Sequence, residues 1–198
     1  METVHLIERC RSGDGLAIGA LVQTYQPPVF RLALSILDDP QEAEEAAQDT
    51  FVAAIRALDT YRGDSSFTTW LYSITINTCR MHLRKGRSRR RLFQALQSLF
   101  EWNRTTTFRI EERVVQNETN STIWKAVQEL DEKHRVPIIL HYYHDLPTNE
   151  IAEILEISPG TVHSRLHTAR VRIQAALQAS PEPEWREEFE QKGNPPTR

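Results

Sequence analysis

Residues 146–170 read LPTNEIAEILEISPGTVHSRLHTAR, and this stretch decides how the second half of the chain folds. Its apolar residues recur at the three- and four-residue intervals that mark one face of an α-helix. Ser158 is suited to cap a second helix, and Pro159 suits the first position of that helix. The pattern therefore predicts a helix over 148–155, a tight turn over 156–158 and a long helix over 159–178.

Two helices joined in this way form a helix-turn-helix when their apolar faces meet in one buried seam. Ala152 is small where the two helices should approach each other closely. The residues spaced to form the seam are Ile151, Leu155, Ile157, Val162 and Leu166.

The outer face of the second helix carries the side chains that a recognition helix needs to meet base edges. These hydrogen-bonding residues are Thr161, His163, Ser164, Arg165, His167 and Thr168. Arg170 and Arg172 are better placed for backbone phosphates. An ordinary helical hairpin with a solvated polar face is the alternative interpretation. The capped turn, the small Ala152 and the donor-rich face together favour DNA binding.

The composition indicates an all-α protein, and the motifs indicate no enzyme activity. The chain has 198 residues and only 7 glycines, and its β-branched runs are short. Neither a membrane span nor a secretory signal is visible, so we expect a cytoplasmic protein without membrane insertion. Cys10 and Cys79 lie far apart and imply neither a disulfide nor a metal site. Because no phosphate loop, nucleophile elbow or carboxylate pair is present, we expect no enzyme activity and no cofactor.

Charge is strongly segregated along the chain, although the formal net charge is only −3. Residues 38–49 contain six acids and no base, whereas residues 80–91 contain seven bases and no acid. Such asymmetry says more about binding partners than the sum does.

The first half predicts a bundle of short helices. Residues 4–11 form one, and Asp14 caps a second with Leu16, Ala17, Ala20, Leu21 and Tyr25 on one side. Pro27 and Pro28 should break or kink this helix before it continues over 29–37. Asp39 caps the next helix, with Pro40 in its first position. Its buried face should contain Ala43, Ala46, Ala47, Thr50, Phe51, Ala54 and Leu58.

A loop over 61–65 follows, with Gly63 as its flexible point, and Ser65 or Ser66 caps the helix after it. Phe67 and Trp70 share a face with Leu71 and Ile74, which favours core packing over stacking on bases. In the second half, Ile123, Val127 and Leu130 mark one helix. Asp131 caps another that holds Val136, Ile139, Leu140 and Tyr143, and Pro137 should bend it.

We therefore expect an all-α fold of two small helical domains joined by a linker. The first domain covers 1–90, and the linker covers 91–121, with a short helix over 93–102. The second domain covers 122–180 and contains the helix-turn-helix, and residues 181–198 form a flexible tail.

Two segments of the chain resemble bacterial RNA polymerase sigma factors of the extracytoplasmic-function (ECF) group. Leu146–Arg170 looks like the region 4 helix-turn-helix, and Asp39–Lys85 is similar to region 2. The most specific part is the acidic helix followed by FTTWLY at 67–72. The two matches stand in the family's order and cover most of the chain.

The resemblance implies a division of labour. The helix over 42–58 would dock on core RNA polymerase, at the β′ clamp helices, through Asp39, Glu42, Glu44, Glu45 and Asp49. A solvated acidic face is the alternative. The −10 element would be held and opened by Gly63, Asp64, Ser65, Ser66, Thr69, Asn77, Arg80 and Arg84. The −35 element would be read by Ser158, Thr161, His163, Ser164, Arg165, His167 and Arg170. The basic run over 84–91 would attract phosphate or serve as a solvated linker.

The chain departs from the family pattern in four places. Glu156 stands where the turn often has Gly, Pro147 replaces a frequent Ser cap, and His163 and His167 replace longer side chains.

The resemblance also implies the polymerase β flap, promoter DNA and an anti-sigma factor as partners. His163 and His167 have a spacing that can bind zinc, but we expect no metal site. Two functions compete with this one: a conventional dimeric helix-turn-helix regulator, and a sigma-like adaptor without promoter opening.

Overall fold

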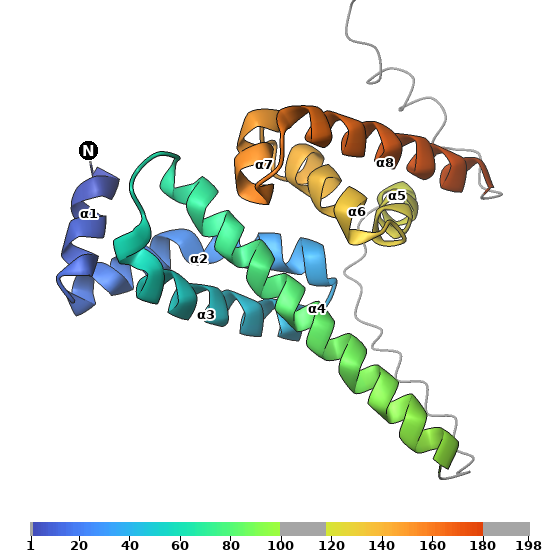
Figure 1. Ribbon diagram of the computed structural model, residues 1–198, viewed down its shortest axis with the longest axis horizontal. Coiled ribbons are helices and arrows are strands. Elements are labelled where there is room, and N and C mark those ends of the chain that lie inside the picture. The colour runs from blue at the N-terminus through green and yellow to red at the C-terminus, as the bar shows by residue number, and fades with distance from the viewer. Residues whose placement is uncertain (1, 100–117, 180–198) are drawn as a thin grey trace, which may run out of the picture. The chain divides into compact units, whose positions relative to one another are not determined.

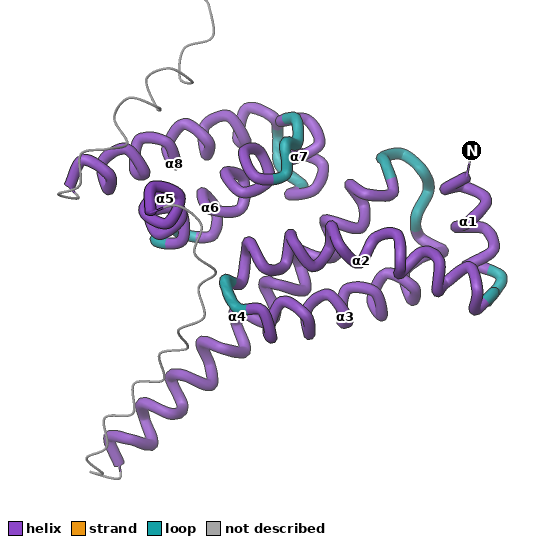
Figure 2. Tube along the Cα trace, turned by 180° about the vertical axis from the view of Figure 1, so that it is seen from behind, coloured by secondary structure: helices purple, strands orange, loops and turns teal. Residues whose placement is uncertain are grey.

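The structure is a computed structural model that describes the backbone of residues 2–99 and 118–179, and the side chains of 3–86 and 122–179. Within these ranges every regular element is helical and there is no strand, as Figure 2 shows. The predicted all-α fold is therefore confirmed. The described residues separate into two compact units. One contains α1–α4 with η1 and α7, and the other contains α5, α6, η2 and α8.

The first unit is built around α2 (Gly15–Leu37), α3 (Pro40–Ala57) and α4 (Phe67–Leu99), which pack pairwise against one another. The short α1 (Glu2–Arg11) packs on α2, and the 3-10 turn η1 (Leu58–Thr60) follows α3. Figure 1 shows α4 continuing well beyond the ends of α2 and α3. The core of this unit includes Leu21, Val29, Phe51 and Leu71, all buried.

The predicted caps begin these helices where expected. The Asp14 carboxylate accepts the backbone N–H of Leu16 at 2.9 Å and of Ala17 at 3.2 Å. The Asp39 carboxylate accepts the N–H of Glu42 at 2.9 Å, with Pro40 in the first turn. The predicted buried face of α3 is confirmed, because each of its residues is buried.

Three features of this unit differ from the expectations. A break or a kink was expected at Pro27 and Pro28, and the break does not occur, because a proline φ suits the helix and buried neighbours such as Val29 hold both halves in the core. Of the residues placed on one side of α2, Ala17 and Leu21 are buried, whereas Leu16, in the first turn beside its cap, is 83% exposed and Ala20 is exposed too. The separate short helix expected over 93–102 is instead part of α4, which runs through the basic stretch to Leu99.

The second unit packs α5 (Glu118–Gln128) and α6 (Glu132–Ile138) against α8 (Pro159–Ala179). Beyond Pro137, where a bend was expected, α6 passes into the π-helical turn η2 (Ile139–Tyr143). Proline lacks the N–H that would bond to the carbonyl four residues earlier, so the ladder is already interrupted there. Of the four residues placed in this helix, Val136, Ile139 and Leu140 are buried, and Tyr143 is 57% exposed.

Helix α7 (Thr148–Leu155) has the bounds that the sequence predicts, and α8 begins at Pro159 as expected. Glu156 ends α7 in the left-handed conformation, with φ of 54°. The Ile157 N–H then donates to the Ala152 carbonyl at 3.0 Å. The buried residues of α7 are Ile151, Ala152, Ile154 and Leu155, and those of α8 are Val162, Leu166, Ala169, Ile173 and Leu177.

The predicted tail over 181–198 and most of the predicted linker, residues 100–117, lie outside the described residues. None of the described helices is both long and apolar enough to cross a membrane.

Candidate nucleic-acid interface

The polar face predicted for the second helix of the helix-turn-helix lies on α8 and on the turn before it. Val162, Leu166 and Ala169 bury one side of α8. Five predicted residues are exposed, namely Ser158, His163, Ser164, His167 and Arg170, and Thr161 and Arg165 are half-buried. A groove-facing helix requires such a row of donors and acceptors near its N-terminus.

The two arginines expected to meet phosphates have different surroundings. The Arg170 guanidinium carbon lies 5.8 Å from the centre of the Tyr142 ring, and both side chains are exposed. Arg172 instead donates from Nη1 to the Asp131 carboxylate at 3.1 Å. Asp131 stands at the expected N-cap of α6, but its side chain caps no backbone N–H. A hydrogen bond from His134 is the main cause that lowers the pKa of Asp131.

The loop predicted to capture an unstacked base joins η1 to α4. Gly63 adopts a φ of +80°, which an L side chain rarely takes, and Gly63 and Asp64 are exposed. The Ser66 hydroxyl caps α4 by accepting the Thr69 N–H at 3.1 Å. Ser65 is half-buried and Thr69 is buried, with its hydroxyl 2.8 Å from that of Ser66.

The two ends of this loop are held by residues to which the sequence analysis gave no role. The Tyr61 hydroxyl donates to the Ser65 carbonyl at 2.8 Å. Arg11, on α1, donates to the carbonyl of Leu58 at 3.1 Å and also to that of Tyr61. The Tyr61 ring packs against Phe67 and Trp70, with ring centres 5.5 Å and 5.4 Å away. Phe67 is buried and Trp70 packs on the core, so the predicted core role of both is confirmed.

Asn77, Arg80 and Arg84 are spaced to share one face of α4 after the loop. Asn77 and Arg84 are exposed, and Arg80 is half-buried. The Arg80 Nη1 donates to the Asn77 side-chain oxygen at 3.2 Å. Of the basic run over 84–91, the side chains beyond Gly86 lie outside the described residues.

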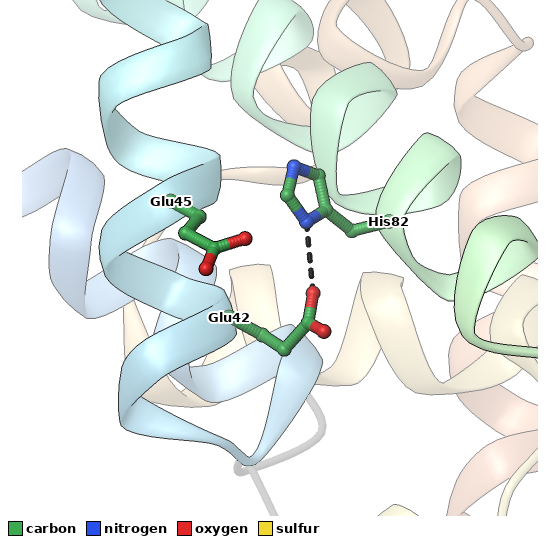
Figure 3. Close-up of side chains that lie close together, drawn as sticks. All are labelled: Glu42, Glu45 and His82. Carbon is green, nitrogen blue, oxygen red and sulfur yellow. Dashed lines mark hydrogen bonds and ion pairs between the residues drawn. The ribbon is translucent and has the colours of Figure 1, made fainter.

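The acidic residues of α3 divide into three kinds. Asp39 is the N-cap of the helix, and Glu44 and Glu45 are exposed. Glu42 and Asp49 both bind His82 of α4 as carboxylate acceptors: Glu42 Oε2 lies 2.9 Å from Nδ1 of the ring, and Asp49 Oδ2 lies 3.0 Å from Nε2. Figure 3 shows Glu42 and Glu45 on α3 with the His82 ring turned toward them from α4.

His82 is the most consequential residue that sequence reasoning missed. Burial, the largest effect, tends to lower the pKa of His82. The hydrogen bonds and charges of Glu42 and Asp49 outweigh it, so that the pKa of His82 is raised above its ordinary value. A signal was available, because Glu42 and Asp49 are two helical turns apart and His82 continues the buried face of Thr75 and Cys79.

The ligand atoms of Glu42, Glu45 and His82 lie within 4.8 Å of one another. A cation could use such atoms, but both His82 nitrogens already meet carboxylates. We therefore interpret the cluster as an ion-pair bridge between α3 and α4. Cys10 and Cys79 are buried and free, and burial raises the pKa of Cys79 to about 12.

One helical chain thus combines the polar outer face of α8, the loop held by Arg11 and Tyr61, and the acidic helix α3. This combination is typical of a DNA-binding factor that also docks on a protein. Comparison with known families agrees with this class. Residues 21–90 match sigma-70 region 2, and residues 121–173 match sigma-70 region 4.

Three relatives illustrate the similarity. The RNA polymerase sigma-H factor of Pseudomonas aeruginosa is 35% identical over 184 residues, covering 87% of this chain and 92% of that protein. The ECF RNA polymerase sigma-E factor of Escherichia coli is 31% identical over 179 residues, covering 87% and 93%. The ECF RNA polymerase sigma factor SigW of Bacillus subtilis is 30% identical over 176 residues, covering 86% and 94%. The chain therefore belongs to the ECF group of RNA polymerase sigma factors.

Two solved structures share the fold. CnrH, solved in complex with the cytosolic domain of CnrY, superposes with a TM-score of 0.61 at 25% identity, covering 88% of this chain and 96% of that one. The sigma factor RpoE of Bartonella quintana, solved in complex with the anti-sigma factor NepR, gives 0.60 at 24% identity, covering 82% and 97%.

Proposed function

We propose that this sigma factor binds core RNA polymerase through the acidic face of α3 and recognises a promoter through two separate segments. The observation that supports this proposal most strongly is that one chain combines both sigma regions with exposed acids on α3 and an exposed polar face on α8. The acids that we assign to the β′ clamp helices are Asp39, Glu42, Glu44, Glu45 and Asp49. Of these, Glu44, Glu45 and Asp49 are the most accessible to a basic partner.

We assign the −35 element to the turn and outer face of α8. The residues proposed to reach bases are Ser158, Thr161, His163, Ser164, Arg165 and His167, with Arg170 on phosphate. The side chains at 163, 164 and 167 are exposed and carry groups that hydrogen-bond to base edges. The Tyr142 ring beneath Arg170 limits the directions that the guanidinium can take.

We assign the −10 element and strand opening to the loop over 61–66 and to the start of α4. Gly63, Asp64, Ser65 and Ser66 would form the pocket for an unstacked base, with Thr69 supporting Ser66 from within. Asn77, Arg80 and Arg84 lie further along α4 and would meet bases or phosphates near the upstream edge of the element. The loop has a flexible glycine, Gly63, and its ends are held by Arg11 and Tyr61. This combination suits a loop that must admit a nucleobase without losing its position.

We infer further that the protein acts in the cytoplasm and that the polymerase performs the chemistry. The β flap would be a second polymerase contact, and an anti-sigma factor would regulate the chain, as the NepR complex illustrates for a protein of the same fold. We propose domain bounds of 1–90 and 122–180, a division supported by the separate family matches at 21–90 and 121–173. The alternative of a dimeric regulator explains α7 and α8, but leaves the region 2 match unexplained.

Two sets of substitutions test this division. Replacing Ser164 and Arg165 by Ala should weaken −35 binding of the holoenzyme by about tenfold or more, because each good base contact contributes about 1–3 kcal/mol. Affinity for core polymerase should stay within about twofold. Reversing Glu44, Glu45 and Asp49 to Lys should lower core affinity and leave the α8 contacts intact.

Core affinity is measured by competition with a labelled sigma factor, and promoter use by run-off transcription. Exposed Gln174 on α8 provides the matched control, and Gln174→Ala should change neither quantity. Equal loss of both activities in both sets of variants would contradict the division of roles. Binding to core without a transcript above the level of core alone would favour the adaptor function.

A further inference from the structure

The His82 ring is a buried titratable group to which the proposed function assigns no role. Its side chain is only 7% exposed, and each ring nitrogen meets a different carboxylate of α3. A histidine satisfies two such acceptors together only when both nitrogens carry a proton, since the neutral ring has a single N–H. The bridge is therefore complete in the imidazolium form, with charge-assisted hydrogen bonds on both sides.

The bridge leaves both acids accessible. The side chains of Glu42 and Asp49 are 40% and 56% exposed, although each gives one oxygen to His82. A carboxylate has about four acceptor positions, so each acid can still receive a donor from a Lys or Arg of a partner. The two acids stand two helical turns apart, which places them on one side of α3.

We propose that His82 is a positioning residue of the polymerase-docking face, which holds the Glu42 and Asp49 carboxylates in the orientation that a basic partner surface meets. This inference rests on the docking role proposed for α3. Free glutamate and aspartate side chains lose rotamer freedom when they dock, and that loss weakens binding by about 0.5–1.5 kcal/mol for each immobilised side chain. Side chains already ordered by His82 avoid this loss.

The charged groups that surround the ring in the described part of the chain belong to α3. Glu42 and Asp49 act on it directly, and Glu45 lies within 4.8 Å of the Glu42 and His82 ligand atoms. When the ring loses its second proton, one of the two acids loses its donor. Positioning should therefore be strongest on the acid side of the His82 titration and should decline as the pH rises.

The test measures the affinity of the full chain for core polymerase in three backgrounds, each with and without His82→Gln. The backgrounds are the wild type, the double variant Glu42→Gln/Asp49→Asn, and Glu44→Gln as a matched loss of one α3 acid that is not bonded to His82. Circular dichroism establishes that each chain is folded. All affinities are taken at about pH 6.5 and again at about pH 8.5.

His82→Gln should weaken core affinity by roughly tenfold at the lower pH in the wild-type and Glu44→Gln backgrounds. In the Glu42→Gln/Asp49→Asn background it should change the affinity by less than about twofold, because nothing remains to be positioned. An equal loss in all three backgrounds would show a merely structural role and overturn the inference. No loss in any background would overturn it as well.

A second comparison covers the case in which His82→Gln does not fold. The ratio of wild-type to Glu42→Gln/Asp49→Asn core affinity should shrink between the two pH values without any change at residue 82. A constant ratio would overturn the inference. The docking role itself fails separately, if Glu44→Lys/Glu45→Lys leaves core affinity unchanged. If that variant weakens binding and His82→Gln does not, only the positioning role is wrong.

Discussion

At the scale of single residues, His82 and Arg11 hold segments that lie far from them in the sequence. His82 joins α4 to acids 33 and 40 positions earlier, and Arg11 reaches carbonyls 47 and 50 positions later. Arg11 lies outside the residues that match the family, and His82 lies inside the region 2 match but has no role assigned by the resemblance. Both act on backbone or side chains that the proposed function needs in a defined place.

His82 should make the stability of the chain depend on pH. Its pKa is raised in the folded state, so its contribution to the unfolding free energy is complete below the unfolded value near 6.5. That contribution is lost as the pH rises through the higher folded value. Urea unfolding of the wild type should thus show a stability that declines from about pH 6 to pH 8.

In His82→Gln this decline should be reduced, because Gln does not titrate, and the other histidines provide a common background. Parallel pH profiles for the two chains would show that the bridge contributes nothing to the folding equilibrium.

Arg11 should matter for promoter opening more than for polymerase binding. Arg11→Ala removes the donors that hold the Leu58 and Tyr61 carbonyls at the base of the loop. We expect about 1 kcal/mol lower stability and a severalfold loss of open complex, measured by permanganate reactivity of unpaired thymines. Arg9→Ala is the matched control, because Arg9 lies on the same helix and pairs with Asp14 on the surface. Equal open-complex formation by both variants would refute the role.

At the scale of elements, local chemistry predicted most helix ends and missed what depends on packing. Asp14, Asp39 and Pro159 begin helices where their side chains or ring predict. Pro27 and Pro28 predicted a break that does not occur, because the buried flanks of α2 outweigh two missing hydrogen bonds. The spacing of Glu42 and Asp49 and the place of His82 on a buried helix face can be predicted from the sequence. The contact between them cannot, since the partners meet only when α3 and α4 pack.

The end of α7 has the only strained residue in the described helix-turn-helix segment. Glu156 has a φ of 54°, where an L side chain costs about 1–2 kcal/mol relative to the right-handed region. Glu156→Gly should therefore raise stability by about 0.5–1 kcal/mol, after allowance for the greater freedom of Gly in the unfolded chain. Urea unfolding followed by circular dichroism measures the change.

Glu153→Gly tests the same substitution inside α7, where the backbone is helical. It should lower stability by about 1 kcal/mol. If both substitutions destabilised the chain, the left-handed turn would not be the conformation that residue 156 prefers in solution.

At the scale of the whole molecule, charge separates the two kinds of binding. The net charge is −3, and six acids fall within 38–49, where we place the polymerase contact. Lys and Arg that meet DNA phosphates supply most non-specific affinity, so a chain with excess negative charge gains little of it. Polymerase binding would cover the acids and add its own DNA contacts. The same acids should thus favour the holoenzyme and disfavour free DNA binding.

Free chain should consequently bind a −35 duplex weakly, with a Kd of about 10⁻⁶ M or higher at near-physiological salt. Glu44→Gln/Glu45→Gln raises the net charge from −3 to −1, because two carboxylates are neutralised. We expect this variant to bind the free duplex a few times more tightly and core polymerase more weakly. Fluorescence anisotropy with a labelled duplex measures the first effect, and a scrambled −35 sequence separates specific from non-specific binding. Nanomolar binding by the free wild-type chain, or two effects of the same sign, would contradict this account of how charge keeps the factor off DNA until it joins the polymerase.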